Sequence, residues 1–195
     1  MSIGILFSEN IAGESRILYH RKIHERVKKI APFITFDRDA YLVIAQEGRL
    51  FWIIDGYTTS DRYPYSEPVR RQGTNYIRNS VKAVVDAYNG TVDFYLSDPN
   101  DPIIQSYAKT FPHLLKPLSA MPEDLREHIR YPQDLFSIQA HLYATYHMQD
   151  PQVFYNKEDL LSIPRRTVEG REREMEPYYT IMRLPGEAKE EFVLL

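Results

Sequence analysis

The sequence predicts an α+β fold, a mainly antiparallel β-sheet with helices packed on it. Three observations predict it. Two apolar runs, Tyr41–Ala45 and Leu50–Ile54, flank a short glycine-containing turn, as in a β-hairpin. A stretch with helical spacing precedes the strand-like run Thr91–Leu96. A second hairpin pattern, Tyr178–Leu184 and Glu191–Leu195, surrounds Pro185-Gly186-Glu187. We expect one soluble domain over residues 1–195.

The stretch Asn75–Leu96 carries the clearest local signals. Apolar residues recur at helical spacing, which predicts a helix over Tyr76–Tyr88 that packs on the sheet: Ile77, Val81, Val84, Val85 and Tyr88. Asn75 is the expected N-cap of this helix. Asn89-Gly90 would end it, because glycine can adopt a positive φ.

The N-terminal part predicts a short strand at Ile3–Phe7 and a basic helix from about Gly13 to Ile30, ended by Pro32. In the first hairpin, Glu47-Gly48 suits a two-residue turn. Both of its arms are apolar nearly throughout, so we expect two central strands covered on both faces.

Further along, Asp101 is the predicted N-cap of the helix Ile103–Thr110, with Pro102 at its first position. Two more helices are expected at Pro122–Arg130 and Pro132–Gln149. Asn156 would cap a last short helix. The charged segment 165–177 is expected to be solvated and mobile.

Composition limits the function classes. The chain has 195 residues, a net charge of −3 and no cysteine. This charge provides no overall attraction for nucleic acid, and thiol chemistry is excluded. No apolar run approaches the ~20 residues that span a bilayer. The abrupt apolar patterns at both ends lead us to expect a fragment of a longer protein.

The loop that follows the first hairpin holds the main candidate site. We expect a polar and aromatic lip that binds a sugar, a lipid head group or a partner chain, formed by Tyr57, Asp61, Arg62, Tyr63 and Tyr65. The alternative, which we favour, is that the loop packs over a sheet edge and Asp61 pairs internally.

Other polar residues are better explained by structure than by chemistry. His20 and His24 have metal-ligand spacing, but no carboxylate joins them, so packing is expected. Asp98, Asn100 and Asp101 suggest calcium, but turn and cap roles between two prolines explain them better. We therefore predict no metal, no cofactor and no catalytic residue. The basic helix could face anionic lipid, although a solvated face is the more common case.

Several runs together resemble uncharacterised protein family 0182, among them Tyr57–Ser66, Asn75–Tyr88, Tyr143–His147 and Asp150–Tyr155. The resemblance covers nearly the whole chain. It implies a large prokaryotic integral membrane protein, of which this chain is part of the soluble, extracytoplasmic region. It implies no activity, because none is assigned to that family.

The leading hypothesis is a binding or assembly module in the cell membrane. Its partners would be the parent transmembrane region and either further copies or another envelope component, and not nucleic acid. One alternative is an enzyme acting on a cell-envelope substrate through Asp61 or Asp55. Another is a small-molecule sensor with a pocket between sheet and helix.

Overall fold

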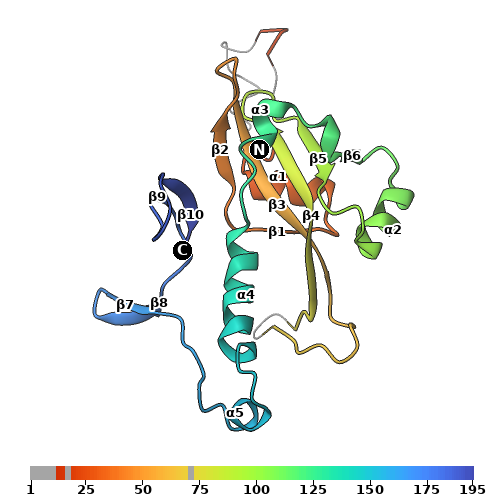
Figure 1. Ribbon diagram of the computed structural model, residues 1–195. Helices are drawn as coiled ribbons and strands as arrows, with labels where there is room; N and C mark the ends of the chain where they lie inside the picture. The colour runs from red at the N-terminus through yellow and green to blue at the C-terminus, as the bar shows by residue number, and fades with distance from the viewer. Residues whose placement is uncertain (1–11, 16–18, 70–72) are drawn as a thin grey trace.

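The fold is α+β, as predicted, and its centre is a six-stranded sheet (Figure 1). The computed structural model describes residues 12–15, 19–69 and 73–195. The predicted strand Ile3–Phe7 lies outside these ranges. Along the sheet the order is β1-β3-β4-β5-β6, and β2 also pairs with β3. The strands are β1 (Thr35–Phe36), β2 (Tyr41–Ile44), β3 (Leu50–Ser60), β4 (Tyr76–Asp86), β5 (Val92–Leu96) and β6 (Leu115–Pro117).

The predicted helix over Tyr76–Tyr88 is wrong, because these residues form strand β4. β4 pairs antiparallel with both β3 and β5, and every residue from 80 to 86 is buried. Its β-branched residues Val81, Val84 and Val85 suit an extended chain. The apolar spacing that resembled a helix face is instead that of a strand covered on both sides. The reversal is confirmed: Gly90 has a φ of 67° and β5 follows.

The first hairpin is confirmed, but its two arms differ in environment. Gly48 supplies the positive φ of the turn, at 74°. β3 continues to Ser60, which is longer than predicted, and it lies inside the sheet. Among the described residues, β2 pairs with β3 alone and leaves Leu42 and Ile44 exposed, so the prediction that β2 is central and doubly covered is wrong.

Helices cover both faces of the sheet. α1 (Ile23–Ile30) and α2 (Pro102–Thr110) pack on one face through Val27 and Ile104. The short η2 (Leu118–Ala120) and α3 (Glu123–Arg126) pack on the other face, where Leu125 is buried. The α2 prediction is confirmed with its Asp101 cap. α1 and α3 are shorter than expected, and residues 19–22 are not helical.

The last third of the chain, residues 131–195, is here called the C-terminal arm. It contains α4 (Gln133–Tyr146), α5 (Pro151–Asn156) and two separate hairpins, β7 (Arg165–Val168) with β8 (Arg171–Glu174) and β9 (Tyr179–Met182) with β10 (Glu191–Leu194). Figure 1 shows both hairpins standing apart from the central sheet.

Two local predictions in the arm need correction. Asn156 ends α5 instead of capping a later helix, and Asp150 is the N-cap. The charged segment 165–177 is exposed as expected, but most of it forms the β7–β8 hairpin. The last predicted hairpin, β9–β10, is confirmed.

Candidate functional site

The structure separates Tyr57 from the other residues of the predicted lip. Tyr57 lies within β3, is only 2% exposed, and donates its hydroxyl hydrogen bond to Asp37. Asp61, Arg62, Tyr63 and Tyr65 lie on the exposed loop beyond the strand. Tyr57 was grouped with them because the sequence did not show that β3 extends to Ser60. The prediction that Tyr57 lines a surface site is therefore wrong.

Asn75 organises the remaining loop instead of capping a helix. Its side-chain oxygen accepts a hydrogen bond from the Tyr63 amide at 3.0 Å, and its amide group donates to the carbonyls of Tyr63 and Ser66. The Tyr63 ring stacks on Tyr76 with centroids 5.5 Å apart. Asp61 and Arg62 form a solvent-exposed ion pair at 3.8 Å. Binding by the four loop residues stays a prediction.

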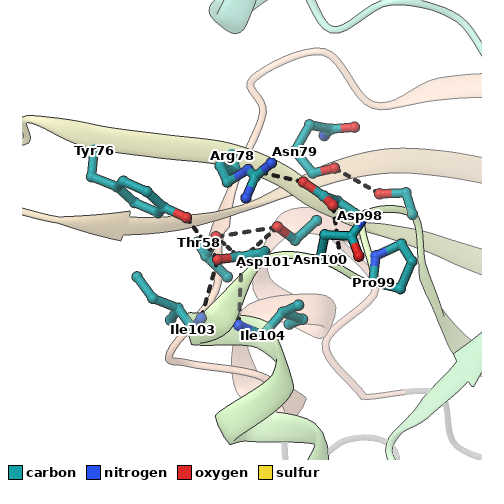
Figure 2. Close-up of polar contacts among 12 residues, drawn as sticks. Thr58, Tyr76, Arg78, Asn79, Asp98, Pro99, Asn100, Asp101, Ile103 and Ile104 are labelled. Carbon is teal, nitrogen blue, oxygen red and sulfur yellow. Dashed lines mark hydrogen bonds and ion pairs between the residues drawn. The ribbon is translucent and has the colours of Figure 1, made fainter.

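The Asp98–Asp101 cluster is a structural junction (Figure 2). The Asp101 carboxylate is fully buried and accepts hydrogen bonds from the Thr58 and Ser80 hydroxyls and, at 2.8 Å, from Tyr76. It also accepts from the backbone amides of Ile103 and Ile104, as the cap of α2. Burial alone would raise the pKa of Asp101, but the hydroxyl donors outweigh it and lower the pKa.

Asp98 points to a different partner, the Arg78 guanidinium, at 2.9 Å. The carboxylates of Asp98 and Asp101 thus satisfy separate donors, as expected for turn and cap residues. Within residues 12–15, 19–69 and 73–195, no group of three or more histidine, cysteine or acidic side chains could hold a metal ion. His24 contacts the Asp37 carbonyl oxygen at 3.0 Å, which fits a packing role.

A second polar junction lies inside the sheet. Asp55 on β3 pairs with Lys82 on β4, and both side chains are almost fully buried. Asn79 donates to the same carboxylate at 3.0 Å. Burial raises the pKa of Asp55, although Lys82 and Asn79 lower it in part. The two acids named as alternatives for an enzyme lie in different environments: Asp55 is internal, and Asp61 is on the surface.

A cavity of about 210 Å³ lies where the arm joins the sheet. It is lined by Asp37, Arg38, Asp39, Gln133, Asp134, Glu176 and Pro177. These groups largely satisfy one another: Arg38 pairs with Asp134 at 2.7 Å, and Gln133 donates to Asp39 at 3.0 Å. The cavity is therefore a polar seam between the central sheet and the arm, and not the sheet–helix pocket that a sensor would need.

Arg130 contacts both the β9–β10 hairpin and the residues around this cavity. Its guanidinium lies between two rings, 3.8 Å from the Tyr41 centroid and 4.6 Å from the Tyr179 centroid. It also pairs with Asp39. The Tyr179 hydroxyl donates to the Tyr131 carbonyl. Burial raises the pKa of Tyr179 to about 12, so this donor keeps its proton at neutral pH.

The arm itself exposes an unusual number of apolar side chains. In residues 131–195 only Pro132, Ala144 and Met148 are buried. Large apolar residues on four of its elements are exposed: Leu142, Tyr143 and Tyr146 on α4, Phe154 and Tyr155 on α5, Ile181 and Met182 on β9, and Phe192 on β10. Exposed apolar side chains gathered on a surface mark interaction sites. The sequence already contained a signal for this exposed apolar surface, because α4 carries apolar residues around much of its circumference.

Comparisons with known proteins agree on one family. The chain matches the uncharacterised protein family UPF0182 over residues 1–195. It is similar to UPF0182 proteins of Geobacter sulfurreducens (63% identical over 98% of this chain), Pelobacter propionicus (61% over 98%) and Pelotomaculum thermopropionicum (56% over 98%). The match spans 21% of the length of each of these relatives. No solved structure matches the chain.

Proposed function

The chain belongs to the uncharacterised protein family UPF0182, and from this premise we propose that it is a soluble extracytoplasmic part of a membrane protein and serves as a binding or assembly module. One observation carries the proposal: residues 131–195 form regular elements that bury almost none of their apolar side chains. Interfaces of permanent protein complexes are richer in apolar side chains than the rest of the protein surface. The function is thus to hold a partner along the C-terminal arm.

The relation to the relatives supports this proposal. The chain corresponds to about a fifth of each relative, so most of a full-length family protein lies outside it. Across the residues that the structure describes, no helix has the length and apolar character needed to cross a membrane. The proposed placement in a membrane protein is supported by the family resemblance described above.

Hydrogen exchange tests the binding role. The test uses a chimera, in which this chain replaces the matching 191-residue segment of the full-length Geobacter sulfurreducens protein. We expect amides of α4, α5 and the two hairpins to exchange at least about tenfold more slowly in the membrane-embedded chimera than in the isolated chain. Amides of β4, which is already buried, serve as the internal reference. Equal exchange of every arm segment in the two proteins would refute the proposal.

Cysteine labelling tests the extracytoplasmic placement. The chain has no cysteine, so Lys189→Cys, at an exposed position between β9 and β10, provides a single label site within it. In a chimera whose other cysteines are replaced, a membrane-impermeant maleimide should label this site in intact spheroplasts. The buried variant Val85→Cys is the matched control and should react only after denaturation. Labelling of Lys189→Cys only after membrane lysis would place the domain in the cytoplasm.

A further inference from the structure

The β9–β10 hairpin has one face made entirely of apolar and aromatic side chains. The register pairs Ile181 with Phe192 and Tyr179 with Leu194. Side chains at alternate positions share a face, so these four lie on one side of the hairpin. The Tyr179 and Phe192 rings stack with centroids 4.7 Å apart. The other face is mixed and includes Thr180 and Glu191.

This apolar face is covered at one end and open at the other. Tyr179 packs against Arg130 and bonds to the Tyr131 carbonyl. Ile181 is 72% exposed and Phe192 58% exposed. A two-stranded hairpin is at best marginally stable in water and needs a third strand or a packed helix. Within the described part of the chain, β9 and β10 pair with each other alone. The hairpin is therefore an incomplete unit.

We infer that the open end of this face is completed by an apolar strand or helix of the same polypeptide, contributed by the part of a full-length family protein that lies outside this chain. The inference rests on the proposed function and names its partner. About four-fifths of each relative is available to supply this segment, because the match spans 21% of its length.

The size of the open surface favours a covalently linked segment over a second copy. A stable complex of separate chains buries about 800 Å² on each partner. A large aromatic side chain buries only about 150–250 Å². Ile181 is 72% and Phe192 58% exposed, so even at the upper value the two side chains offer about 325 Å², which is under half of what a stable dimer requires. A linked segment does not need a large interface, since linkage raises its effective concentration to roughly millimolar.

The test introduces a charge on the open face and compares it with a matched position. Ile181→Glu is the test variant. Ile44→Glu is the control, because Ile44 is also a strand isoleucine and is 65% exposed, but on β2 of the central sheet. Exchange of the β9–β10 amides is measured in the isolated chain and in the chimera. Exchange of β4 shows in every sample that the central sheet is folded.

We expect the hairpin amides to exchange at least about tenfold more slowly in the chimera than in the isolated chain. Ile181→Glu should remove this difference, and Ile44→Glu should leave it intact. Protection in the isolated chain that rises with protein concentration would identify a second copy as the partner and overturn the inference. Unchanged hairpin exchange, with slower exchange of α4 and α5, would also overturn it while leaving the proposed function standing. If no arm segment slows, the proposed function fails as well.

Discussion

Replacement of Asp101 by alanine should destabilise the central sheet and α2 together. The Asp101 carboxylate is the point where three strand side chains and two helix amides meet (Figure 2). Loss of an acidic N-cap costs about 1 kcal/mol. Thr58 and Ser80 are fully buried, and their hydroxyl oxygens are 3.2 Å apart, so each can partner the other. One hydroxyl is then left without an acceptor, at a cost of about 1–3 kcal/mol.

The expected loss for Asp101→Ala is therefore about 2–4 kcal/mol, a large share of the ~5–15 kcal/mol that stabilises a typical domain. Urea unfolding at pH 7, followed by fluorescence of the sole tryptophan, Trp52, measures this loss. Asp98→Ala is the control. It removes the partly exposed pair with Arg78 and an exposed hydrogen bond from the Asn100 amide, and we expect a loss below about 1 kcal/mol.

The pH dependence gives a second check of the same reasoning. The pKa of Asp101 is lower in the folded state than its ordinary value. Its stabilising contribution is thus complete above the unfolded pKa, about 3.9, and is lost as the pH falls through the folded pKa. The difference between wild type and Asp101→Ala should shrink below about pH 4. A loss under about 0.5 kcal/mol at pH 7, or a difference that grows on acidification, would refute the assigned role.

Three further variants test other parts of the fold. Lys82→Met leaves the buried Asp55 carboxylate without its cation, so urea unfolding should show a loss of about 3–5 kcal/mol at pH 7. Burial already raises the pKa of Asp55, and the loss of Lys82 raises it further. The stability of this variant should therefore increase as the pH falls from 7 to 5. A stability that does not change with pH would contradict the reasoning. Gly56→Ala should lower the free energy of unfolding by about 1–3 kcal/mol in the same assay, because the new Cβ would lie 2.9 Å from Ile34 Cγ2. An unchanged stability would show that the sheet can relax around the added methyl group. Arg130→Ala should raise the hydrogen exchange rate of the β9–β10 amides in the isolated chain to nearly that of an unstructured peptide, while β4 exchange is unchanged. Retained protection of these amides would show that the hairpin does not depend on Arg130.

Short-range signals in the sequence determined the turns and caps. The first hairpin, the Gly90 reversal, the Asp101 cap of α2 and the β9–β10 hairpin all depend on residues a few positions apart. Each needs only a residue with the right backbone freedom or a side chain that reaches a nearby amide. These features were therefore predictable without tertiary contacts, and with them the α+β class.

The identity of β4 and the position of the candidate surface were decided by the tertiary structure. Helical spacing of Val81, Val84 and Val85 is compatible with either state, and the pairing of β4 between β3 and β5 made it a strand. Tyr57, which the sequence suggested for the surface, is buried where β3 pairs with β1 and donates its hydroxyl hydrogen bond to Asp37. Ile181 and Phe192 are apolar and yet stay exposed, which composition could not show. Burial depends on which elements pack together and not on the residue type alone.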